Sequence, residues 1–195
     1  MSWCRASEIG AAATAGDVLA VQDLLELYGI SFYKTSSWSV HDPTLERVSN
    51  DDYRIYASRY VISLDQAQCL DGQFEPQDLT VVSADGETVV LTLPDGPVGP
   101  IYFTGVVGRA QQQALSAGDT LEVGDTLLRS ATARFISETE TAQADDILLV
   151  PPELLRNCAV TLGRRLIKRK LDEDADGNMT SLLEDMEDEL RLYQT

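Results

Sequence analysis

The sequence is poor in the side chains on which most enzymes and metal sites depend. It contains one histidine, His41, and three cysteines, Cys4, Cys69 and Cys158. A single histidine excludes a site with several histidine ligands and leaves nucleophilic catalysis with one candidate base. The odd number and wide spacing of the cysteines match neither a disulfide framework nor a zinc site, so we expect free thiols. Because the nucleophile-elbow, P-loop and zinc-protease motifs are also absent, we predict neither an enzyme nor a bound cofactor.

Long hydrophobic runs and positive charge are scarce as well. The apolar runs are too short to span a bilayer, and the opening residues MSWCRASEIG lack the apolar core of a signal peptide. The chain has 15 lysines and arginines against 32 acidic residues, which gives a formal net charge of -17. Such a charge repels both anionic membranes and nucleic acid phosphates. We therefore expect no membrane partner, and at most DNA that passes without tight binding.

Apolar spacing predicts a helix near the N-terminus, over residues 14–29. Thr14 with Asp17 resembles a capping box at its start, and Gly29 is a natural stop at its end. The apolar residues recur at helical spacing and predict one buried stripe. They are Val18, Val21, Leu24, Leu25, Leu27 and Tyr28.

The middle of the chain predicts short β-strands. Residues 53–64 alternate between polar and apolar, but the phase changes within the segment, which indicates a bulge or two short strands. Residues 84–87, Ala-Asp-Gly-Glu, stand between the strand-like segments 79–83 and 88–93 and predict a hairpin turn.

Further strands are predicted at residues 101–107 and 127–136. Gly-Asp pairs at 118–119 and 124–125 predict turns that separate two more short strands. About seven short strands punctuated by glycine and proline are typical of a sandwich or a partial barrel.

Helical patterns return after an acidic linker. Pro151 and Pro152 stand where a helix can begin, and a second helix is predicted over residues 180–193. The 195 residues are enough for one medium or two small domains. We predict an α+β fold in which residues 1–36 and 146–195 form a helical bundle. Residues 37–145 would be an inserted antiparallel β module, either a sandwich or a partial barrel.

An acidic motif between the two C-terminal helices raises the question of calcium. An EF-hand loop needs a bidentate glutamate at its twelfth position, but that position is Leu183, and Glu184 follows one residue late. A solvated turn with Thr180 as the next helix cap explains the same residues. A calcium-binding helix–loop–helix module attached to a β domain is therefore our second hypothesis, and we assign no metal ligand. The motif, D-x-D-x-D-G, consists of Asp172, Asp174, Asp176 and Gly177.

Charge is distributed very unevenly near the C-terminus, where a basic helix end precedes an acidic helix. The two groups could pair within one chain as a helical hairpin. They could instead join the basic end of one subunit to the acidic helix of the next, a heterologous contact of the kind that generates rings. A third explanation is that both face water, where a surface ion pair contributes at most about 1 kcal/mol. The basic residues are Arg164, Arg165, Lys168, Arg169 and Lys170. The acidic residues are Glu184, Asp185, Glu187, Asp188 and Glu189.

Two segments resemble the head–tail adaptor proteins of tailed phages, most closely the gatekeeper or tail-tube adaptors of short-tailed phages. Residues 17–29, DVLAVQDLLELYG, are similar to the opening helix of that family. Residues 149–170, LVPPELLRNCAVTLGRRLIKRK, are similar to its later helix, in which a proline start leads into a basic amphipathic stretch. The acidic segment 172–193 matches the following helix in character.

The resemblance implies a structural virion protein. Such a subunit would assemble with copies of itself as a ring beneath the portal protein, join tail proteins to the head and surround the DNA channel. It would be located in the neck or tail of the virion after assembly in the host cytoplasm. The resemblance also implies that the basic residues 164–170 contact the portal or a neighbouring subunit.

Overall fold

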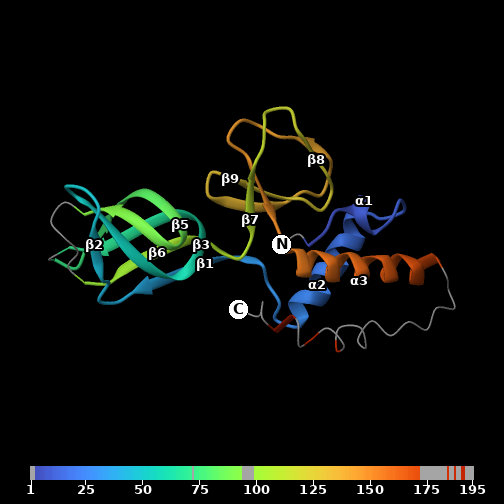
Figure 1. The fold of residues 1–195 in the computed structure, drawn as a ribbon, viewed down its shortest axis with the longest axis horizontal. Coiled ribbons are helices and arrows are strands. Elements are labelled where there is room, and N and C mark those ends of the chain that lie inside the picture. The colour runs from blue at the N-terminus through green and yellow to red at the C-terminus, as the bar shows by residue number, and fades with distance from the viewer. Residues whose placement is uncertain are drawn as a thin grey trace. The chain divides into compact units, whose positions relative to one another are not determined.

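The protein is predominantly β in this computed structural model (Figure 1). The structure describes residues 3–71, 73–93, 99–171, 184, 187, 190 and 191. Of these residues, 45% lie in strands and 23% in helices. Contacts divide the chain into two compact units. Unit 1 comprises residues 1–32, 110–129 and 133–195, and unit 2 comprises residues 33–109 and 130–132.

The predicted fold class is wrong. The described part of the chain has three helices and several antiparallel sheets, rather than a helical bundle with an inserted β module. The reason lies in unit 1, where the helices share one compact unit with six short strands that form a small sheet system. Helical periodicity at the two ends of a sequence does not indicate whether helices or strands will cover the apolar faces.

Unit 1 contains three helices in the described part of the chain, and the second and third begin where local signals predict. The three helices are α1 (Ala6–Ile9), α2 (Ala15–Leu27) and α3 (Glu153–Leu171). The predicted cap of α2 is confirmed, because Asp17 accepts hydrogen bonds from the Thr14 backbone N–H at 2.7 Å and from its hydroxyl at 2.9 Å. Gly163 on α3 allows α1 to approach closely, since a Cβ there would stand 2.5 Å from a carbon of Ile9. The short helix α1 was not predicted.

Unit 2 is built around one long strand. Its strands are β1 (Tyr33–Val40), β2 (Leu45–Arg47), β3 (Asp52–Leu70), β4 (Pro76–Asp78), β5 (Thr80–Thr92) and β6 (Ile101–Gly108). They pair antiparallel in the order β1-β6-β3-β2, and β4 and β5 also pair with β3. The predicted bulge in β3 is confirmed, because the register with β5 shifts between Tyr56 and Val61.

The predicted hairpin at residues 84–87 is wrong. Strand β5 runs through this segment without turning, and Gly86 pairs with Val61 just beyond the bulge of β3. Gly86 has φ +58°, and a Cβ at that position would contact the Tyr60 ring at 3.7 Å. The glycine therefore shapes a bend opposite the bulge instead of reversing the chain.

The core of unit 2 is aromatic and aliphatic. Trp38 stacks on Phe103 with ring centroids 5.3 Å apart, and its indole N–H donates to the Ala57 carbonyl at 2.8 Å. The cluster comprises Ile55, Ala57, Val61, Ala67, Val89, Leu91, Leu93, Ile101 and Phe103. All of these side chains are buried, so the sheet encloses its own core.

Six short strands complete unit 1. They are β7 (Gln111–Ala114), β8 (Thr120–Leu121), β9 (Thr126–Arg129), β10 (Thr132–Phe135), β11 (Glu140–Thr141) and β12 (Ile147–Val150). One sheet has the order β10-β9-β12-β7, and β11 pairs with β8. Their core comprises Leu121, Leu127, Ile136, Ala142 and Leu148.

The same aspartate turn occurs three times between these strands, at residues 116–119, 122–125 and 143–146. In each, the backbone N–H of the fourth residue donates to the first carbonyl, at 3.0, 3.0 and 3.4 Å. In each, the carboxylate of the fourth residue, an aspartate, accepts the first backbone N–H, at 2.8, 2.9 and 2.8 Å. The two Gly-Asp turns are thus confirmed, and the third was missed because Asp145 stands where the others have glycine.

The last of these aspartates also anchors β9 to β12. Arg129 donates to Asp146 through Nε at 2.7 Å and through Nη2 at 2.6 Å. The Asp146 carboxyl is buried, and it also accepts the Gln143 backbone N–H at 2.8 Å. The Arg129 hydrogen bonds, against the opposing effect of burial, lower the pKa of Asp146 to about 2.

We predict that two alanine substitutions in equivalent turns have unequal effects. Gly118 and Gly124 have φ +100° and +99°, so both substitutions strain the backbone. A Cβ on Gly124 would stand 2.2 Å from the Cys4 carbonyl oxygen, whereas nothing lies within 4 Å of one on Gly118. Gly124→Ala should therefore lower the free energy of unfolding by about 1–3 kcal/mol more than Gly118→Ala does. Urea denaturation of both variants measures this difference, and equal losses would contradict the close approach.

Candidate functional site

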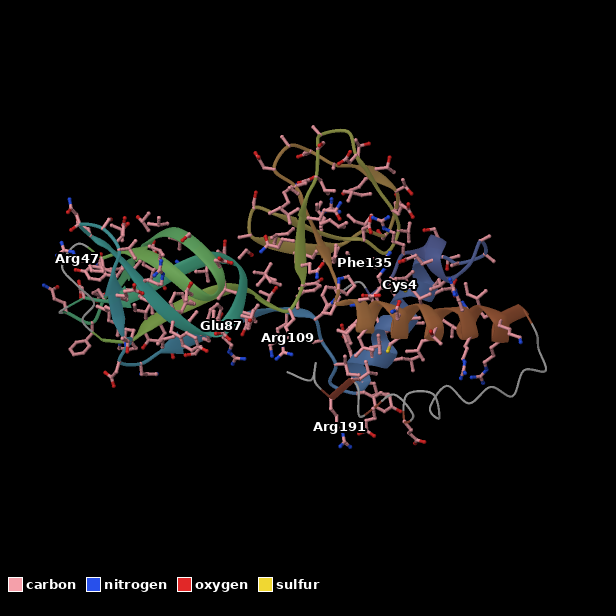
Figure 2. All side chains as sticks on the ribbon, viewed as in Figure 1. Cys4, Arg47, Glu87, Arg109, Phe135 and Arg191 are labelled. Carbon is pink, nitrogen blue, oxygen red and sulfur yellow. The ribbon has the colours of Figure 1, made fainter. Side chains whose placement is uncertain are left out.

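The predicted basic cluster lies at the end of α3. Nitrogen-tipped side chains project from the last turns of this helix in Figure 2. All five residues are exposed, and they lie at the helix C-terminus, where cations interact favourably with the helix dipole. They are Arg164, Arg165, Lys168, Arg169 and Lys170.

Two of the five cations are used within unit 1. Arg164 donates through Nε to the Glu8 backbone carbonyl at 3.2 Å, which joins α3 to α1. Lys170 forms an ion pair with Asp17, which joins the end of α3 to the start of α2. These two side chains therefore have structural partners already.

The other three cations have no partner among the residues that the structure describes. Arg165, Lys168 and Arg169 have no hydrogen bond or ion pair with any residue that the structure describes. Their spacing of i, i+3 and i+4 places them as neighbours on one side of the helix. We call these three residues the basic face.

Of the predicted acidic partners, the structure describes Glu184 and Glu187, and neither forms an ion pair with the basic face. Glu184 is exposed, and Glu187 pairs with Arg191 at 3.1 Å. Asp185, Asp188 and Glu189 lie outside the described residues. The proposed calcium ligands Asp172, Asp174 and Asp176, with Gly177, also lie outside them, so the calcium hypothesis stays a prediction.

Asp17 is the acidic group that the structure places at the end of α3. Its side chain is buried, and it accepts hydrogen bonds from Thr14 as well as from Lys170. The Lys170 hydrogen bond lowers the pKa of Asp17, helped by Thr14 and partly opposed by burial. The sequence alone predicts only a capping role for Asp17, because no local pattern links it to Lys170, which lies 153 positions later.

The remaining candidate groups for chemistry are dispersed. His41 is exposed, and its Nε2 lies 3.2 Å from the Ser39 hydroxyl. Burial, with the nearby Glu8 charge, raises the pKa of the Cys4 thiol to about 12, and burial also raises that of Cys69. Raised pKa values keep these thiols protonated and unreactive at neutral pH.

The described residues lack two features that would indicate a metal site or a membrane span. Among them, no group of three or more His, Cys, Asp or Glu side chains is arranged to hold a metal ion. Likewise, none of the helices in the described ranges is long and apolar enough to cross a membrane. Neither a protein-family model, a curated protein nor a solved structure matches this chain.

We predict that Lys170→Met destabilises the protein and that Lys168→Met does not. Removing Lys170 leaves the buried Asp17 charge without its cation, which should cost about 1–3 kcal/mol of unfolding free energy at neutral pH. Lys168 is an exposed, unpaired lysine on the same helix, so its replacement should change stability by at most about 0.5 kcal/mol. Chemical denaturation at a series of pH values measures both effects.

The stability difference between the native protein and Lys170→Met should depend on pH. Because the pKa of Asp17 is lowered in the folded protein, the stabilisation from Lys170 is fully present above the unfolded pKa of about 4. It is lost as the pH falls through the lower folded value. The difference between native protein and Lys170→Met should therefore shrink in acid. A difference that stays constant down to low pH would contradict the role of the Asp17 carboxylate.

Proposed function

We propose that the protein is a structural virion subunit, a head–tail adaptor that assembles as a ring. The ring would join the portal protein to tail proteins around the DNA channel. The observation that supports this proposal is the basic face of α3, Arg165, Lys168 and Arg169, on a chain of net charge -17. The resemblance of residues 17–29 and 149–170 to adaptor helices is its second support.

Electrostatics favours a contact between unlike patches. Copies with this net charge repel one another at long range, so self-association needs a local region of opposite sign. The basic face supplies that region, and the acidic segment 184–189 of a neighbouring copy has the complementary charge. Joining two different patches of the same chain is a heterologous contact, which closes into a ring when the rotation between subunits permits.

The same charge balance suits a DNA channel. Phosphates are repelled by a surface rich in carboxylates, so DNA can move past it without being held. In this proposal the basic face contacts protein, either a neighbouring subunit or the portal, and has no catalytic role. The virion neck is the proposed location.

We predict that the full-length chain forms a single closed oligomer and that charge reversal on the basic face dissociates it. Arg165→Glu should shift the protein towards smaller species, because it places a carboxylate against an acidic partner. Higher salt should also shift the protein towards smaller species, because it screens the contact. Native mass spectrometry and sedimentation velocity at several concentrations measure the mass.

Arg59→Glu is the matched control for this variant. Arg59 is also exposed and has no ion pair with the described residues, but it lies on β3 in unit 2. Both substitutions change the net charge by the same amount, so an effect of total charge would appear in both. A chain that is monomeric at every concentration, or a loss of assembly that is equal in both variants, would contradict the proposal.

A further inference from the structure

A small polar cavity lies within unit 1, away from the basic face. Its volume is about 260 Å³, and it lies between the N-terminal residues, the turn that precedes β9, the strand β12 and the first turns of α3. Cys4, labelled in Figure 2, is one of the N-terminal residues that line it. The side chains that matter here are Trp3, Arg5, Glu8, Asp125, Thr126 and Arg156.

The two carboxylates of the cavity already accept hydrogen bonds from the protein. Glu8 accepts from Arg156 Nε at 2.9 Å through Oε1 and from the Arg5 backbone N–H at 2.7 Å through Oε2. Asp125 accepts from Arg5 Nε at 2.7 Å through Oδ1 and from the Glu122 backbone N–H at 2.9 Å through Oδ2. Each carboxylate oxygen thus has a donor from within the protein.

The donors of the cavity are in excess. A guanidinium has five N–H groups, and Arg156 uses Nε and Nη2 on Glu8. Arg5 uses Nε on Asp125, and its Nη1 lies 3.8 Å from Glu122. Further N–H groups on both arginines have no acceptor assigned among the described residues. A ligand that supplies acceptor oxygens matches this surplus.

Two polar atoms in the wall are buried without an assigned partner. The indole N–H of Trp3 and the hydroxyl of Thr126 are fully buried, and neither has a hydrogen-bond partner among the described residues. An indole N–H can only donate, and burying it unpaired costs free energy that most native structures avoid. Trp38 in unit 2 shows the usual situation, since its indole N–H donates to a carbonyl at 2.8 Å.

We infer that this cavity binds a small organic carboxylate. The guanidinium groups of Arg5 and Arg156 would take its oxygens in the planar geometry that suits a carboxylate. This inference does not rest on the proposed assembly function.

The charge and the size of the cavity further restrict the class of ligand that fits it. Arg5 and Arg156 are balanced by Glu8 and Asp125, so the charged side chains of the site sum to zero. A planar carboxylate can accept two parallel N–H bonds from one guanidinium, and each carboxylate group brings a single charge near Glu8 and Asp125, whereas phosphate brings its whole charge to one point. A cavity of about 260 Å³ corresponds to roughly eight or nine water volumes, which suits an organic acid of a few carbon atoms.

Isothermal titration calorimetry of the full chain with succinate tests the inference, with acetate and inorganic phosphate as comparators. We expect saturable binding of succinate with one site per chain, and weaker binding of phosphate. Arg156→Met should weaken succinate binding by about tenfold or more, because it removes a charge-assisted donor. Arg59→Met is the matched control, because Arg59 is exposed and has no ion pair with the described residues, and this variant should bind as the native protein does.

Arg156→Lys guards against a purely structural effect of the Arg156→Met substitution. It keeps a positive charge beside Glu8 but removes the planar guanidinium, so the protein should remain folded while succinate binding weakens several-fold. Thermal melts of each variant establish that it is folded. Absence of saturable binding by both succinate and acetate would overturn the inference. Native affinity in Arg156→Met, or phosphate binding as tight as succinate binding, would overturn it as well.

Discussion

The attachment of the N-terminal segment to the 122–125 turn is the contact on which much of unit 1 depends. The Ala6 backbone N–H donates to the Val123 carbonyl at 2.9 Å, and Arg5 binds Asp125 at 2.7 Å. Gly124 makes the contact possible, because any side chain there would collide with the Cys4 carbonyl. This attachment fixes where α1 begins, and α1 in turn holds α3 through Glu8.

The basic face and the polar cavity both follow from that arrangement. Glu8 binds Arg156 near the start of α3 through its carboxylate and Arg164 further along through its backbone carbonyl. The first contact closes one side of the cavity. The second holds the helix whose last turns carry the unpaired cations. One short helix thus supports an assembly surface and a ligand cavity that are otherwise separate.

Features that depend on neighbouring residues were predicted well, and features that depend on distant partners were not. The cap of α2 involves Thr14 and Asp17, three positions apart, and the bulge of β3 leaves its mark in the local phase of alternation. By contrast, the residues around Gly86 predict a hairpin turn, and only the pairing of Gly86 with Val61 shows that the strand continues. The fold class failed for the same reason, since short strands of residues 111–150 joined the terminal helices in one unit.

The candidate site also contains side chains whose partners are too distant in the sequence to be predicted. The sequence predicts a basic helix end, but it does not divide the five cations into used and unused ones. That division depends on Glu8 and Asp17, which lie 156 and 153 positions away from Arg164 and Lys170. The cavity was missed entirely, because Trp3, Thr126 and Arg156 carry no common motif. The sequence signal for this cavity was the aspartate at the end of a Gly-Asp turn, Asp125, which is buried and binds Arg5.

The ion pair between half-buried Arg129 and buried Asp146 separates precipitation of the protein in acid from its unfolding. The isoelectric point of the chain is about 4.2, so electrostatic repulsion between molecules vanishes there and the protein should come out of solution. Asp146, with a pKa of about 2, is still ionised at that pH and still joins β9 to β12. Material that precipitates near the isoelectric point should therefore retain this part of its fold and redissolve when the pH is raised, whereas exposure to much stronger acid would remove the pair itself.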